Sequence, residues 1–87
     1  MISKKAVVTN KVGLHARPAT FFIQKANEFK STIWVEMDDR RVNAKSLLGV
    51  LSLGVVKDSE ITLIANGADE EDAIQALEEL LQSGLSD

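Results

Sequence analysis

Residues 31–44 read STIWVEMDDRRVNA and predict the β-hairpin on which the rest of the fold depends. The residues before the turn alternate between the two faces of a strand, with Ile33, Val35 and Met37 on one face and Thr32, Trp34 and Glu36 on the other. Asp38 and Asp39 then reverse the chain, and residues 40–44 return as the second strand. This turn is weaker than one that contains glycine, because an aspartate at its second position tolerates positive φ less well.

The segments on either side of the hairpin carry the patterns of further strands and helices. Residues 2–8 and 60–66 predict strands, and apolar residues at three- and four-residue spacing predict a helix over residues 16–27. A short helix is expected over residues 47–53, and another begins near residue 69, where four acidic residues face the positive end of its dipole. This order predicts an α+β fold, with three helices on one face of a four-stranded, mostly antiparallel sheet whose other face is polar.

Length and composition limit the classes of protein to consider. A chain of 87 residues has room for one domain, which we place over residues 1–87. It contains no cysteine and one histidine, so disulfides and thiolate metal sites are excluded, and we expect neither a metal nor a cofactor. The sequence lacks the roughly 18 apolar residues of a membrane span and the apolar stretch of a secretory signal, so we expect a cytoplasmic protein that does not insert into membranes.

Charged residues are divided unequally along the chain. Residues 1–57 hold all ten lysines and arginines against four acidic residues, whereas residues 58–87 hold nine acidic residues and no basic one. The basic residues form no arginine-rich run and have no interleaved aromatic residues. We therefore expect acidic partners rather than nucleic acid.

The segment GLHARPA, residues 13–19, contains the only histidine and the only proline of the chain. His15 is predicted to cap the helix that starts at Ala16, with Arg17 and Pro18 in its first turn. Backbone N–H groups of Ala16 and Arg17, together with the Arg17 guanidinium, would form a cradle for phosphate oxygens. A neutral imidazole can accept a phosphoryl group, so the motif suits reversible phosphorylation of His15. The residues alone leave open a plain capping or surface role for this histidine.

Ser46 lies in a second motif, NAKSLLGVLSLG at residues 43–54. Its ordinary role is to cap the short helix that follows. That helix carries more apolar residues than two turns on a surface can bury, so some must be exposed as a docking patch. We expect partners to dock on Thr20, Leu47, Leu48 and Leu51. A phosphate on Ser46 would place about two negative charges beside the patch and change the choice of partner.

The two motifs, at this separation, closely resemble HPr, the family of histidine-containing phosphocarriers of the bacterial sugar phosphotransferase system, and the similarity covers the whole chain. The resemblance implies an open-faced β-sandwich and a monomeric phosphoryl carrier rather than a free-standing enzyme. It implies that enzyme I, charged by phosphoenolpyruvate, phosphorylates Nδ1 of His15 with the assistance of Arg17, and that IIA domains of sugar permeases receive the group.

The resemblance also implies a regulatory alternative. In Gram-positive relatives an HPr kinase/phosphorylase phosphorylates the serine that matches Ser46, and the protein then serves as corepressor of a catabolite-control transcription factor. The HPr-like protein Crh of bacilli shares this serine region and typically lacks the histidine, whereas His15 is present here. Leu48 and Leu51 replace methionines common in Gram-positive relatives, and Val12 replaces a usually polar residue. The carrier and the Crh-like regulator therefore both remain open.

Overall fold

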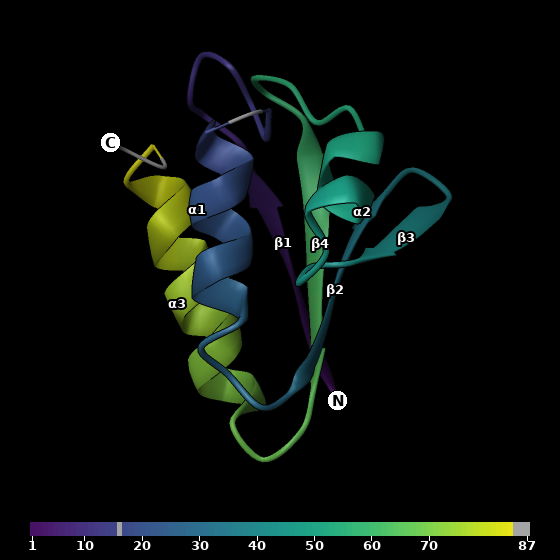
Figure 1. Ribbon diagram of the computed structural model, residues 1–87, viewed down its shortest axis with the longest axis vertical. Helices are drawn as coiled ribbons and strands as arrows, with labels where there is room; N and C mark the ends of the chain where they lie inside the picture. Colours follow the sequence, from purple (N-terminus) through teal and green to yellow (C-terminus); the bar gives the residue numbers. More distant parts are fainter. Residues whose placement is uncertain (16, 85–87) are drawn as a thin grey trace.

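The computed structural model describes residues 1–15 and 17–84. Its elements follow the predicted order (Figure 1) and are β1 (Ile2–Val7), α1 (Arg17–Ala26), β2 (Thr32–Met37), β3 (Arg40–Asn43), α2 (Leu47–Ser52), β4 (Glu60–Asn66) and α3 (Glu70–Gln82). The sequence predicted the bounds of β2 and β4 correctly and placed the other ends that it predicted within two residues of those observed; it gave no C-terminal end for α3.

The strands form one sheet in the order β1-β4-β2-β3, and every described pair is antiparallel. The three helices lie on one side of this sheet, where α1 packs between α2 and α3 (Figure 1). This arrangement confirms the predicted α+β class with one open sheet face. Neighbouring strands in this sheet are not always consecutive in the sequence, since β4 lies between β1 and β2.

The core lies between the sheet and the helices. Alternate residues of the two central strands point into it, and Ile33, Val35, Ile61, Leu63 and Ala65 are all at most 1% exposed. The helices contribute their apolar stripes, including Phe22 of α1, Val50 of α2 and Leu77 of α3. The apolar faces of the strands and of the helices therefore pack together in one hydrophobic cluster, as expected for amphipathic elements.

The open face of the sheet is less polar than the sequence predicted. Trp34 and Ile64 are direct cross-strand partners on this face, and Ile64 is only 5% exposed although no helix covers it. The Arg41 guanidinium, from the adjacent β3, lies 5.9 Å from the centre of the Trp34 ring. A large aromatic side chain and its neighbours can bury an apolar residue within a single sheet layer, which explains the difference.

The hairpin turn differs in one detail from the prediction. The positive φ falls on Asp38, with a value of 56°, rather than on Asp39 at the second position of the turn. Two-residue hairpin turns of the common types require positive φ at their first central position, and aspartate is among the residues that tolerate it. The strain therefore lies one residue earlier than expected.

The loops α1–β2 and β4–α3 lie together at the end of the molecule opposite the β1–α1 loop (Figure 1). The Asp69 carboxylate accepts hydrogen bonds from the N–H groups of Lys30 and Ser31 at 2.8 and 2.9 Å and a third from the Ser31 hydroxyl. The Ser31 hydroxyl, followed by the Lys30 N–H, lowers the pKa of Asp69 to about 2. Asp69 therefore fastens the two loops to each other.

The length and apolar content of the helices show whether any of them could span a membrane. Within the part of the chain that the structure describes, none of them is long and apolar enough to cross a membrane.

Candidate functional site

Hydrogen bonds to backbone carbonyl groups fix the β1–α1 loop. The Asn10 side chain donates from Nδ2 to the Gly13 carbonyl at 2.8 Å, and the Gly13 N–H donates back to the Asn10 carbonyl at 3.3 Å. The Leu14 N–H donates to the Val55 carbonyl at 3.0 Å, and the Leu14 side chain is 1% exposed. The residue before His15 is thus held to the core and to the chain that follows α2.

Gly13 allows this loop to approach the segment after α2. Its φ is 64°, in the left-handed region that favours glycine. A Cβ at this position would overlap the Val55 carbonyl oxygen and lie 2.6 Å from the Cα of Val56. Only a residue without a side chain therefore fits this close approach to the chain beyond α2.

His15 is exposed at the end of this loop. Ala16, expected to contribute one N–H of the phosphate cradle, lies outside the described residues, so the described part of α1 begins with Arg17 and Pro18. Proline suits this first turn because its missing N–H would have no partner within the helix. The structure therefore places an exposed imidazole just before a helix start, where anions are favoured.

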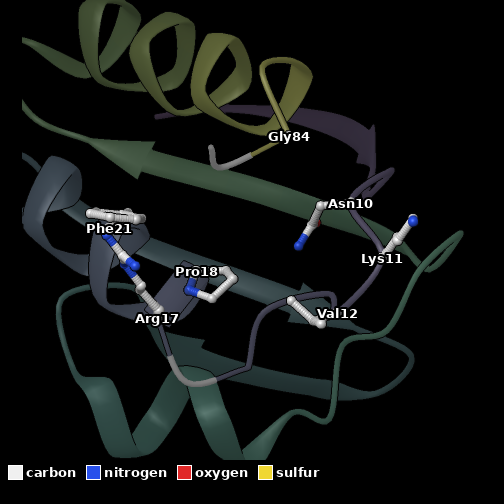
Figure 2. Close-up of a pocket in the computed structure, with 7 residues that line it drawn as sticks. All are labelled: Asn10, Lys11, Val12, Arg17, Pro18, Phe21 and Gly84. Carbon is white, nitrogen blue, oxygen red and sulfur yellow. The ribbon is translucent and has the colours of Figure 1, made fainter. Parts of the chain in front are cut away.

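A hollow of about 330 Å³ lies next to this helix start, lined by Asn10, Lys11, Val12, Arg17, Pro18, Phe21 and Gly84 (Figure 2). Arg17 lines it with its side chain extended along α1, so that the guanidinium carbon lies 5.5 Å from the centre of the Phe21 ring. Sequence reasoning missed Phe21. The signal was available, because residues four apart on a helix face each other.

The α2 helix presents the second candidate site. Ser46 has an extended backbone (φ −106°, ψ 118°), and its hydroxyl oxygen accepts from the Gly49 N–H at 3.1 Å, as an N-cap does. Leu48 is 81% exposed and Leu47 38%, whereas Val50 is fully buried.

The other expected members of the patch are less open. Leu51 and Thr20 are half-buried, and Leu53 belongs to the core. The apolar excess of α2 is therefore divided between the core and the surface, with Leu48 as its most exposed side chain.

An arginine from the hairpin steadies the other end of α2. Arg40 donates from Nη1 to the Ser52 carbonyl at 2.6 Å and from Nη2 to the Ser52 hydroxyl at 3.1 Å. The planar guanidinium is suited to such paired contacts, and a cation is favourable where helix carbonyls lack partners. The sequence did not predict this contact, because no local pattern relates Arg40 to Ser52.

Within residues 1–15 and 17–84, no three His, Cys, Asp or Glu residues gather closely enough to hold a metal ion. The groups that the candidate sites offer are an imidazole, a guanidinium, hydroxyls and backbone N–H groups.

Comparisons with known proteins identify the family of this chain. A family model described as "PTS HPr component phosphorylation site" matches residues 2–83. The HPr-like protein Crh of Bacillus subtilis is 46% identical over 82 residues, which cover 94% of this chain and 96% of Crh.

Solved structures give the same picture. HPr-C-His from Thermoanaerobacter tengcongensis superimposes with a TM-score of 0.97 at 48% identity, over 100% of this chain and 98% of that one. A crystal structure of Bacillus subtilis Crh as a domain-swapped dimer has a TM-score of 0.77 at 44% identity, over the whole of both chains. The similarity thus extends to proteins named as HPr and to proteins named as Crh.

Proposed function

This chain belongs to the HPr family of the phosphotransferase system, and from that membership we propose that it is a phosphoryl carrier whose acceptor is His15. The observation that carries the proposal is the exposed imidazole of His15 on a loop that backbone hydrogen bonds fix in place. A transfer site must be open to two successive partners and must present its acceptor atom in a constant position.

The proposed step is a displacement at phosphorus. The bond between phosphorus and the donor breaks as a bond forms to a ring nitrogen of His15, and the donor atom regains its electron pair. The reverse exchange delivers the group to the next acceptor. Negative charge on the phosphoryl oxygens is balanced by the helix start and by the Arg17 guanidinium, with Ala16 and Arg17 as the proposed N–H donors.

The partners follow from family membership as proposals. Enzyme I, charged by phosphoenolpyruvate, is the donor, and IIA domains of sugar permeases are the acceptors. We place their contact surface on Thr20, Leu47, Leu48 and Leu51, because Leu48 is a large apolar side chain with 81% of its surface exposed. The carrier acts as a monomer in this proposal, and light scattering at working concentration tests that state.

The first experiment is intact-mass measurement after incubation with enzyme I and phosphoenolpyruvate. The proposal predicts a gain of one phosphoryl group that disappears in acid, since phosphohistidine is acid-labile and phosphoserine is not. His15→Ala is the matched control and must show no gain. An acid-stable gain, or a gain in the His15→Ala variant, contradicts the proposal.

A second function is supported by Ser46 and by the relatives named Crh. We propose that phosphorylation of Ser46 by an HPr kinase/phosphorylase makes the chain a corepressor for a catabolite-control transcription factor. The supporting observation is that the Ser46 hydroxyl caps α2 within two residues of the exposed Leu48, so a phosphate would alter the charge beside the docking surface.

Two variants separate the functions. Ser46→Ala should abolish modification by the kinase with ATP and leave transfer from phosphoenolpyruvate intact, whereas His15→Ala should do the reverse. If the wild-type chain is modified only by the kinase, the regulatory function is the correct one.

A further inference from the structure

The contact between Arg17 and Phe21 has a consequence for the transfer reaction. We propose, on the basis of the function proposed above, that Phe21 is a positioning residue that holds the Arg17 guanidinium away from His15 until a phosphate on His15 draws it off. The observation is the 5.5 Å separation between the guanidinium carbon and the centre of the Phe21 ring. This separation lies within the range of an attractive cation–π interaction.

The direction of the Arg17 side chain supports this role. Phe21 follows Arg17 by four residues, so its Cα lies about 6 Å further along the helix axis. His15 precedes the helix in the sequence, whereas Phe21 lies about one turn beyond Arg17. Figure 2 shows the Arg17 side chain running along α1 to the Phe21 ring, so the guanidinium points away from Val12 in the β1–α1 loop.

The surroundings favour the stacked position over a free one. Phe21 is half-buried, and with Pro18 it forms an apolar wall of the hollow that Arg17 lines. A guanidinium is weakly hydrated and stacks on aromatic faces more readily than an ammonium does. The stack therefore gives Arg17 a resting position before a phosphate is present.

A phosphate on His15 competes with the ring for the same guanidinium. Paired, charge-assisted hydrogen bonds to phosphate oxygens are stronger than a cation–π contact at an exposed site. The guanidinium therefore moves when His15 is phosphorylated. The loss of its cation–π contact with Phe21 makes the phosphorylated form less stable than it would be without that contact. We expect removal of the ring to increase phosphoryl acceptance by about two- to fivefold.

A competition experiment measures this factor. Wild-type chain and the Phe21→Leu variant, mixed in equal amounts, share a limiting quantity of phosphoenolpyruvate with a catalytic amount of enzyme I, and intact mass resolves the four species at equilibrium. Phe21→Leu should hold two to five times more phosphoryl group than wild type. Phe21→Tyr, which retains an aromatic face, should share equally.

The same competition in an Arg17→Ala background isolates the path through the arginine. A positioning role predicts that Phe21→Leu then has no advantage, because there is no guanidinium to release. A preference that persists without Arg17, or equal sharing in both backgrounds, overturns the inference.

A spectroscopic measurement keeps this inference separate from the carrier function. In the unphosphorylated chain, NMR signals of the Arg17 side chain should carry a ring-current shift that Phe21→Leu removes. In the wild type the shift should also disappear on phosphorylation. Absence of the shift contradicts the inference even if phosphoryl transfer occurs, whereas a wild type that shows the shift but accepts no phosphoryl group contradicts the carrier function.

Discussion

Gly13 approaches Val55 so closely that a Cβ on Gly13 would overlap the Val55 carbonyl oxygen. The neighbouring Leu14 N–H donates to that same oxygen at 3.0 Å. The position of His15 therefore depends on a backbone-to-backbone contact between the β1–α1 loop and the segment after α2.

Gly13→Ala should displace the loop and slow phosphoryl transfer to His15. Gly54→Ala is the matched control, because both glycines have positive φ, 64° and 68°, but a Cβ at Gly54 meets nothing within 4 Å. The free energy of unfolding of this control should fall only by the cost of placing alanine in the left-handed region, about 1–2 kcal/mol. Denaturant unfolding and transfer rates measure both variants, and equal losses in the two would contradict a role for the Val55 contact.

Arg17→Ala should lower the rate of transfer to His15 by about 10- to 100-fold, the value of one hydrogen-bonded interaction with a charged group. Arg17→Lys should retain the charge and lose the paired hydrogen-bond geometry, so its transfer rate should lie between those of wild type and Arg17→Ala. Lys11→Ala is the control, since this exposed cation lines the same hollow. A loss in the control as large as that in Arg17→Ala would indicate general attraction of an acidic partner instead.

Leu48→Ala should leave stability unchanged within about 0.5 kcal/mol, because the side chain is 81% exposed. The same change should weaken association with enzyme I. Val50→Ala, two residues away and fully buried, should cost on the order of 2 kcal/mol. Thermal unfolding and binding calorimetry distinguish the effects. Unchanged binding of enzyme I to Leu48→Ala would show that α2 is not part of the docking surface.

Ser46→Ala should lower the free energy of unfolding by about 1 kcal/mol, since its hydroxyl caps the Gly49 N–H. For a chain of this size, that loss corresponds to roughly 4–8 °C in Tm. Ser46→Asp should recover most of it, because aspartate caps helices as well as serine does. Ser3→Ala, at an exposed position of β1, provides the baseline for loss of a hydroxyl.

Stability should depend on pH through Asp69. Its pKa is lowered from 3.8 to about 2, first by the Ser31 hydroxyl and then by the Lys30 N–H. A carboxyl with a lower pKa in the folded state contributes stability that is fully present above pH 3.8 and is lost as the pH falls through about 2.

Urea unfolding between pH 2 and pH 5 tests this contribution by comparing wild type with Asp69→Asn. The advantage of the wild type should shrink as the pH falls, and Ser31→Ala should reduce its size. Because the Gly67 N–H also lowers the pKa of Glu70, the difference between wild type and variant is the quantity that isolates Asp69. Asp39→Asn, in the exposed hairpin turn, is the control and should not reproduce the change.

The elements that sequence alone predicted well are those whose pattern is local. The alternation of residues 32–37 and 60–66 determined both central strands, and the apolar spacing of residues 19–26 indicated the buried side of α1. These patterns reflect burial against a single neighbouring layer, so they need no knowledge of the partner.

The features that were missed depend on residues brought together by the fold. Asp69 was expected to act on its own helix, but its carboxylate binds Lys30 and Ser31, which are 39 and 38 residues away in sequence. The burial of Ile64 likewise requires the register that pairs it with Trp34. At the candidate site the sequence indicated His15, Arg17 and Ser46, but not the direction in which the Arg17 side chain extends.

The fastening of the α1–β2 loop to the β4–α3 loop has a practical use. These loops lie at the end of the molecule opposite the β1–α1 loop (Figure 1), and Ala68 is exposed within them. A biotin or fluorophore attached through Ala68→Cys would be the only thiol label on a chain that has no cysteine of its own. The chain could then be immobilised on a sensor surface with its histidine loop directed outward, so that partners are free to arrive and leave.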